Sequence, residues 1–306
     1  MSEKIPHIDI CIASYKRPQL LAKLLESLAA QKLPMGVTIG VIVVDNDLAG
    51  TARDTVENAM VTGLPVRYFQ QPKKNISLTR NMGVANSTGE YIAFIDDDEY
   101  AESEWLKNLY ETLQTFQADV VFGPVICEVP PDAPDWLLTG HFFEWPRYKT
   151  GAVISGRGTG NVLIRAHALP DRGAPFNPKF GLTGSEDADL FRRMQLSGAK
   201  LVWCDEAVAR ETLVPERFGA EFLIRRAFRD GQMFAEIFVK PQGIFRKILW
   251  FIYRAALVLI ALVGALFAWP ARKSWGVKCF MKVASNVGQL SSLFPYRFEL
   301  YKDNKA

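Results

Sequence analysis

Short apolar runs alternate with segments of helical spacing through the first part of the chain. The runs cover residues 8–13, 37–44, 65–69, 91–95 and 119–123. Between the first two runs, Pro18 suits a first helical turn, and a stripe of leucines follows at helical spacing: Leu20, Leu21, Leu24, Leu25 and Leu28. Strands that alternate with helices are typical of a parallel sheet built from βαβ units. The pattern therefore predicts an α/β fold.

Beyond this region the pattern changes twice. From residue 124 to 184 it loosens, because prolines and clustered aromatic side chains interrupt it, so we expect an irregular region with short mixed strands. Residues 186–196 then have the spacing of a helix that Gly198 closes, and residues 201–203 follow as a strand.

The C-terminal part of the chain is apolar. Residues 248–269 form a stretch of 22 residues with Arg254 as its only charge, which is long enough to cross a hydrocarbon core. Residues 276–294 add a second, weaker apolar helix. Basic residues on both sides leave the orientation open: Arg246, Lys247, Arg272, Lys273 and Lys278. We expect a membrane-associating helical region over 244–294, as a span, a hairpin or an in-plane anchor, with a buried core helix as the alternative.

Composition narrows the class of protein. The chain has 306 residues and 49% hydrophobic content, which is enough for a large core. Its net charge of +3 does not favour nucleic acid as a partner. The four cysteines form no CxxC pair, which predicts reduced thiols rather than zinc or disulfides. No signal-peptide pattern precedes the first apolar run, so we expect the catalytic part of the chain to stay inside the cell.

Polar groups follow three of the predicted strands, at residues 14–17, 45–47 and 96–99. The carboxyl ends of strands in an open α/β sheet line a ligand crevice. Four consecutive acids, Asp96 to Glu99, repel one another and favour a cation among them, and hard oxygen ligands select magnesium or manganese. A solvated acidic turn is the alternative. Asp45 could accept hydrogen bonds from a ribose or a base, or it could cap a helix.

A further acidic pair opens the predicted helix at 186–196. A carboxylate at a helix N-terminus is stabilised as the anion, the state that a general base needs, although helix capping alone would also explain Glu186 and Asp187. Arginines could clamp a diphosphate or remain solvated at the surface: Arg80, Arg225, Arg226 and Arg229. A dinucleotide-binding GxGxxG is absent after the first strand, and the glycines at 156–160 precede a strand-like run instead of a helix.

Four motifs in a fixed order carry a resemblance to a known family: CIASYKRP, VVDND, LTRNMGVANSTGEYIAFIDDDE and GSEDADLFRRM. In this order they resemble the family 2 glycosyltransferases, which have a GT-A fold, a mixed sheet flanked by helices. Segments such as GTGNVLIR and RRAFRDG are similar to bacterial exopolysaccharide enzymes of the succinoglycan biosynthesis ExoM type. The resemblance covers residues 5–235, which we therefore expect to form a GT-A catalytic domain.

The resemblance implies roles for individual residues. Nucleotide-sugar contacts are implied for Ala13, Tyr15, Asp45, Arg80, Asp96, Asp97, Arg226 and Arg229. Asp98 matches the direct metal ligand of the DxD-type motif, with Asp96 as a second ligand, and the implied metal is Mn²⁺ or Mg²⁺. Asp187 matches the general base, with Glu186 beside it. The QxxRW motif of processive members is absent, which implies the transfer of one sugar per encounter.

The resemblance also implies a reaction. It is the inverting, non-processive transfer of a sugar, with UDP-glucose as the expected donor, to a lipid-linked glycan acceptor in exopolysaccharide or cell-surface polysaccharide biosynthesis. We expect this at the cytoplasmic face of the inner (plasma) membrane. The alternative is a membrane-anchored sugar-nucleotide-binding or scaffold protein with a degenerate transferase domain. Retention of Asp45, Asp96, Asp98 and Asp187 counts against that alternative.

Overall fold

The computed structural model describes residues 5–241, 243–292, 294 and 297–299. These residues divide into two compact units. Unit 1 holds the chain up to residue 127, then 145–182 and 186–212, and unit 2 holds 128–144, 183–185 and the chain from 213 onward. The expected ranges 5–235 and 244–294 stay predictions, and residue 293 of the second range lies outside the described residues.

Unit 1 is built on strands flanked by helices. The strands are β1 (His7–Ser14), β2 (Thr38–Asp45), β3 (Val66–Gln70), β4 (Tyr91–Ile95), β5 (Glu99–Ala101), β6 (Val120–Phe122), β7 (Val125–Glu128), β8 (Asn161–Arg165), β9 (Leu201–Trp203) and β10 (Ala209–Thr212). The helices are α1 (Pro18–Ala29), α2 (Arg53–Val61), α3 (Ile76–Ala85), α4 (Trp105–Thr115) and α6 (Glu186–Leu196), with 3-10 turns at Ala166–Ala168 and Pro178–Phe180. Every strand predicted from an apolar run is present.

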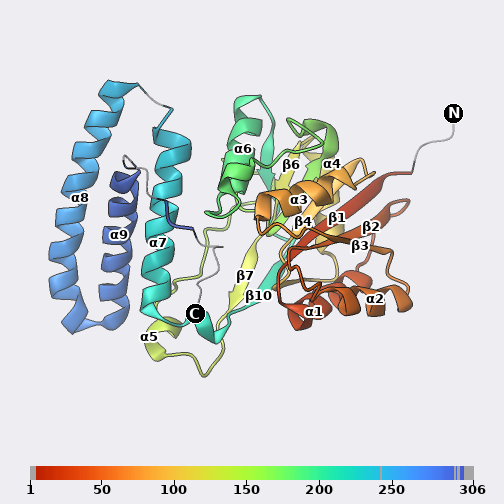
Figure 1. Ribbon diagram of the computed structural model, residues 1–306, viewed down its shortest axis with the longest axis horizontal. Coiled ribbons are helices and arrows are strands. Elements are labelled where there is room, and N and C mark those ends of the chain that lie inside the picture. The colour runs from red at the N-terminus through yellow and green to blue at the C-terminus, as the bar shows by residue number, and fades with distance from the viewer. Residues whose placement is uncertain (1–4, 242, 293, 295–296, 300–306) are drawn as a thin grey trace. The chain divides into compact units, whose positions relative to one another are not determined.

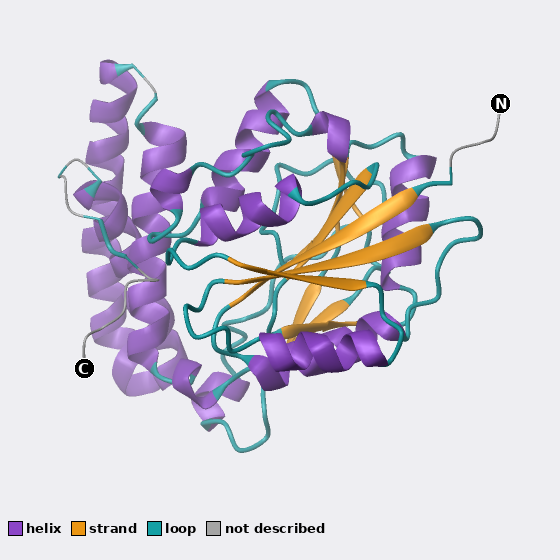
Figure 2. Cartoon of the chain, turned by 45° about the vertical axis from the view of Figure 1, so that its right-hand side comes forward, coloured by secondary structure: helices purple, strands orange, loops and turns teal. Residues whose placement is uncertain are grey.

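The main sheet of unit 1 is mixed. Its seven strands follow the order β3-β2-β1-β4-β8-β6-β9, and β8 runs antiparallel to both β4 and β6. A second sheet has the order β5-β10-β7. Because β1, β2, β3 and β4 are parallel, their carboxyl ends meet at one edge, where Ser14 pairs with Asp45. This confirms the predicted mixed sheet flanked by helices (Figure 2), and the pairing of Ser14 with Asp45 places two of the predicted polar strand ends together.

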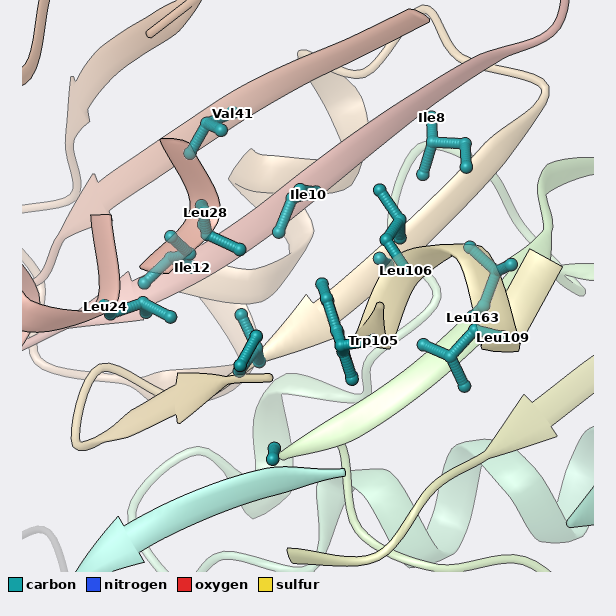
Figure 3. Close-up of a cluster of buried hydrophobic side chains, with 14 of the residues drawn as sticks. Ile8, Ile10, Ile12, Leu24, Leu28, Val41, Trp105, Leu106, Leu109 and Leu163 are labelled. Carbon is teal, nitrogen blue, oxygen red and sulfur yellow. The ribbon is translucent and has the colours of Figure 1, made fainter. Parts of the chain in front are cut away.

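Helices cover both faces of this sheet, which is why the central strands read as continuous apolar runs. Ile8, Ile10 and Ile12 of β1 pack with α1 and α4, including the fully buried Trp105 (Figure 3). Cys11, between them in sequence, belongs to the opposite face, with residues of α3 and α6. Side chains alternate because successive residues of a strand point to opposite faces. The sheet is therefore packed on both faces, and this packing holds its carboxyl edge in position.

Unit 2 is helical in its described part. Its elements are α5 (Asp135–Leu138), a 3-10 turn at Pro215–Arg217, α7 (Ala220–Phe234), a π-helical turn at Ala235–Val239, α8 (Ile244–Ala271) and α9 (Lys273–Ser291). Helix α9 packs against α7 and α8, and the three run alongside one another in Figure 1. A Cβ atom on Gly231 of α7 would overlap the carbonyl oxygen of Ser285, and one on Gly288 of α9 would overlap that of Phe228. The two backbones therefore touch through a reciprocal pair of glycines.

Helices α8 and α9 form the C-terminal hairpin that the apolar pattern predicted. Residues 244–269 of α8 are long and apolar enough to cross a membrane, with a mean hydropathy of 2.3 and 12% of the most apolar window buried. Large side chains of α8 are exposed, among them Leu259 and Ile260 at 66% each. Arg254 turns toward α9, where Nη1 donates to Asn286 Oδ1 at 3.1 Å. The single charge of the apolar stretch thus has a partner inside the hairpin.

Candidate active site

The first part of the site is the acidic loop, defined here as Asp96, Asp97 and Asp98 between β4 and β5. Asp97 is 5% exposed and accepts hydrogen bonds from Ser14 Oγ at 3.0 Å, from the Tyr15 amide at 3.1 Å and from Arg17 Nη1 at 3.0 Å. Burial raises the pKa of Asp97 to about 6, although Arg17 opposes the shift. These bonds join the acidic loop to the end of β1, as the parallel sheet predicts.

Arg17 also reaches the last acid of the loop. Its Nη1 lies 2.8 Å from Asp98 Oδ2. Burial would lower the pKa of Arg17, but Asp98 and Asp97 outweigh it and raise the pKa, so the guanidinium stays charged. The sequence patterns place Arg17 among the polar residues that follow the first predicted strand but give it no role of its own. Its signal is that position, shortly after β1, which ends at Ser14 at the same edge as the acids.

Arg80 joins the acidic loop to the start of α6. It lies on α3 and is 8% exposed, and its Nη2 donates to Asp96 Oδ1 at 2.9 Å while its Nη1 donates to Glu186 Oε1. Burial raises the pKa of Glu186 to about 7, and Arg80 counteracts this. Asp187, the next residue, is half-buried, and a Cβ on Gly158 would lie 3.2 Å from its Oδ2. The glycine-rich segment 156–160 therefore borders Asp187.

Glu99 has a different position from the other three acids. It is 5% exposed in β5, and its Oε2 accepts from the Asp96 amide at 3.1 Å. Burial raises the pKa of Glu99 well above its ordinary value. Its own amide donates back to the Asp96 carbonyl at 3.1 Å. Glu99 is thus hydrogen-bonded to the backbone of the acidic loop and is buried like Asp97, whereas Asp96 and Asp98 are partly exposed.

Three of the predicted nucleotide-binding residues, Ala13, Tyr15 and Asp45, lie at or directly after the ends of β1 and β2. Asp45 is 0% exposed and accepts from the amides of Asp47 at 2.9 Å and Ala52 at 2.8 Å and from Tyr68 Oη at 3.2 Å. Since Ala52 is the N-cap of α2, Asp45 also shapes the start of that helix. Ala13 is half-buried and pairs with Val44, beside Asp45.

Tyr15 completes this side of the site. The half-buried ring has Lys74 Nζ at 4.4 Å and Lys16 Nζ at 5.2 Å from its centroid. Neither lysine was singled out by the sequence patterns. Two residues next to predicted site residues have left-handed backbones, Lys16 with φ 57° and Ser185 with φ 71°. Residues other than glycine rarely adopt this backbone conformation, so it is an unusual feature of both segments.

Arg226 and Arg229 lie on α7, in unit 2. Arg229 Nε donates to Asp230 Oδ1 at 2.9 Å, and Arg226 Nε lies 3.9 Å from Asp230 Oδ2. The diphosphate contact implied for them stays a prediction.

The acidic loop offers the oxygen donors that magnesium or manganese prefers. Within the residues that the structure describes, no three His, Cys, Asp or Glu side chains are grouped to hold an ion by themselves. Arg80 engages one oxygen of Asp96 and Arg17 one oxygen of Asp98, and the side chain of Asp96 is 41% exposed. Such a donor set fits a divalent cation that takes its remaining ligands from water and a substrate diphosphate.

Comparison with known proteins identifies the family and the fold of the chain. The model of the family Glycosyl transferase family 2 matches residues 9–170. The succinoglycan biosynthesis protein ExoM of Rhizobium meliloti is 38% identical over 235 residues, which are 76% of this chain and 75% of that protein. Mannosyltransferase PcManGT from Pyrobaculum calidifontis, solved with GDP-Man and Mn²⁺, has a TM-score of 0.66 at 18% identity over 95% of this chain and 88% of its own.

A second solved structure shares the fold. TarS 1–349 of S. aureus in complex with UDP-GlcNAc has a TM-score of 0.54 at 19% identity and covers 92% of this chain and 91% of its own. These likenesses confirm the predicted GT-A fold. The family match spans more than half of the chain, and it contains the acidic loop, Asp45 and Arg80. The chain belongs to glycosyl transferase family 2 and is a glycosyltransferase.

Proposed function

We propose that the chain is an inverting, non-processive glycosyltransferase that moves glucose from UDP-glucose to a lipid-linked glycan in exopolysaccharide or cell-surface polysaccharide biosynthesis. The observation that supports this best is the junction at Arg80, which brings the acidic loop and the Glu186–Asp187 pair together at the carboxyl edge of the sheet. The identity to a succinoglycan biosynthesis protein supports the polysaccharide setting.

In the proposed mechanism, Asp187 removes a proton from the acceptor hydroxyl as the oxygen attacks the anomeric carbon of the donor sugar. A new glycosidic bond forms, and the bond between the anomeric carbon and the diphosphate oxygen breaks, so the configuration inverts. Tyr15 and Ala13 face the base, and Asp45 supports this end of the site. A divalent metal held by Asp98 and Asp96, when bound, would neutralise charge on the diphosphate.

The lysines beside Tyr15 add positive charge to the nucleotide side of the site. Lys74 and Lys16 lie near the same ring, so both ammonium groups would attract a diphosphate placed there. Arg17 keeps its charge next to Asp98 and could neutralise the same group. We propose that these three cations stabilise the departing UDP, and that Arg226 and Arg229 assist.

A lipid-linked acceptor would require the enzyme to work at a membrane surface. The exposed apolar side chains of α8 and the basic residues around the hairpin support binding to a membrane with anionic headgroups. We propose the cytoplasmic face because the four cysteines, none of which forms a disulfide, suit a reducing compartment.

Product analysis tests this proposal. The purified chain is incubated with membrane extract, Mn²⁺ and each of a panel of UDP- and GDP-sugars, and lipid-extractable products are measured by mass spectrometry. The expected result is a gain of one hexose with UDP-glucose alone and no longer series of products. A gain with another sugar would overturn the donor assignment, and products only in the aqueous phase would overturn the lipid-linked acceptor.

A further inference from the structure

Arg80 contacts two carboxylates that belong to different parts of the site. Its side chain is 9% exposed, that of Glu186 is 2% exposed, and the two residues lie 106 positions apart in the sequence. One arm of the guanidinium holds Glu186 and the other holds Asp96. A planar guanidinium can bridge two carboxylates in a fixed geometry, which the single ammonium of a lysine cannot do.

The helix that carries Arg80 is attached to the segment before α6 at further points. Asn75, the N-cap of α3, donates through Nδ2 to the Pro178 carbonyl at 3.0 Å, and the Ile76 amide donates to the Gly181 carbonyl at 3.1 Å. Asn81, next to Arg80, exchanges two hydrogen bonds of 2.8 Å with the backbone of Phe176. Helix α3 is thus bound along its length to residues 176–181.

Apolar packing also supports the position of Arg80 relative to the acidic loop. The Arg80 guanidinium lies 6.0 Å from the centroid of the Phe176 ring, and that ring packs edge-to-face on Phe94 of β4 at 5.5 Å. Since β4 leads directly into the acidic loop, the same cluster supports both ends of the bridge. Glu186 Oε2 is buried and has no hydrogen-bond partner among the described residues, so the bond from Arg80 to Oε1 is what stabilises the charge of this carboxylate.

We propose that Arg80 is a positioning residue, which sets the placement of the Glu186–Asp187 pair relative to the acidic loop, rather than a nucleotide contact as the family resemblance implies. The inference rests on the proposed function of Asp187 as the base. Loss of the bridge leaves donor binding intact but displaces the base from the acceptor hydroxyl. A misplacement of about 1 Å can cost roughly 100-fold in rate.

The test compares Arg80→Gln, Arg80→Lys, Glu186→Gln and the double variant Arg80→Gln/Glu186→Gln in the full chain. We expect Arg80→Gln to lower kcat by roughly 30-fold or more in the membrane-extract assay while the Kd for UDP with Mn²⁺, measured by calorimetry, changes by less than about 3-fold. Arg80→Lys should recover little activity. The double variant should be no slower than the slower single variant, because both changes break one bridge.

Arg165→Gln is the matched control. Arg165 of β8 pairs with Tyr91 at the amino end of β4, the sheet edge opposite the acidic loop, and its loss should leave kcat unchanged. A raised Kd for UDP in Arg80→Gln, or additive losses in the double variant, would overturn the proposal in favour of a nucleotide contact. If Arg80→Gln does not fold, Glu186→Gln decides alone, and wild-type turnover in it would refute the bridge. No transfer by the wild-type chain would count against the proposed function instead.

Discussion

At the scale of single residues, Asp187 carries the sharpest expectation. It follows the buried Glu186 at the start of α6 and is itself half-buried, so it can meet an acceptor. We expect Asp187→Asn to lower kcat by roughly 100-fold or more with little change in the affinity for UDP, because a positioned general base acts on the chemical step. Steady-state rates and UDP calorimetry check this. Unaltered turnover would mean that another residue takes the proton.

The acidic loop predicts a dependence on metal. We expect the affinity for UDP to fall when EDTA removes Mn²⁺ or Mg²⁺, and Asp98→Ala to reproduce that loss without further sensitivity to EDTA. Calorimetry with both proteins measures it. Asp119→Ala is a control, since that carboxylate accepts from the Lys200 amide at 2.8 Å, outside the acidic loop. Equal affinities with and without EDTA in the wild-type chain would show that binding needs no metal.

The sequence predicted the acids of the site better than their partners. Asp96, Asp97, Asp98 and Asp45 were visible because each follows an apolar strand, and parallel strands bring their ends to one edge. Contacts between residues that are distant in the sequence produce no comparable pattern in the sequence. Nothing in the local pattern links Arg80 to Glu186 or Arg17 to Asp98, because those contacts depend on how α3 and α1 pack on the sheet.

At the scale of elements, the contact between α7 and α9 depends on the absence of side chains at Gly231 and Gly288. We expect Gly231→Ala to lower the thermal midpoint of the chain in detergent by several degrees, because the added methyl would overlap the Ser285 carbonyl and overpacking costs about 1–3 kcal/mol. Thermal unfolding followed by circular dichroism measures the change.

Gly264→Ala provides the comparison. This glycine lies inside α8, and a Cβ there would be 3.5 Å from Cys279 Sγ, an ordinary contact. Since alanine favours a helix by about 1 kcal/mol over glycine, the control should be neutral or stabilising. If both variants behaved alike, close approach of α7 and α9 would not contribute to stability.

Elements differed in how well the sequence predicted them. Strands β1, β2 and β4 were clear because burial on both faces makes them continuously apolar. Strands β5 and β10 were not predicted, because they are short and carry polar residues such as Glu99 and Arg210. They pair in antiparallel orientation although they lie about 100 residues apart, so no short turn motif in the sequence indicates the pairing.

At the scale of the whole molecule, we expect α8 to bind the protein to a membrane, because the helix is long, apolar and largely exposed. We expect the triple change Ile252→Ser, Leu259→Ser and Ile260→Ser to move the chain from vesicles of anionic lipid into solution. Each exposed apolar side chain contributes about 1.5–3 kcal/mol when removed from water, so partitioning should weaken by about 1,000-fold or more. Flotation with the vesicles measures the bound fraction.

Two exposed apolar residues of unit 1 give the control, since Met35→Ser with Val61→Ser should leave partitioning unchanged. Truncation before α8 would be a poorer experiment. It would also remove α9, and with it the partner of α7 and the hydrogen bond of 2.8 Å between Gln232 and Ser291. A wild-type chain that stays wholly in solution would refute membrane binding.

The left-handed backbones of Lys16 and Ser185 affect which residues a selection experiment would enrich at these two positions. Glycine and asparagine reach this conformation with less strain than other residues do. A randomised library at either position, sorted for folded protein, should therefore enrich those two residues. A library sorted for sugar transfer should return lysine or serine wherever the side chain itself is used. Comparison of the two enriched populations then distinguishes residues that the backbone conformation requires from residues that the substrate requires.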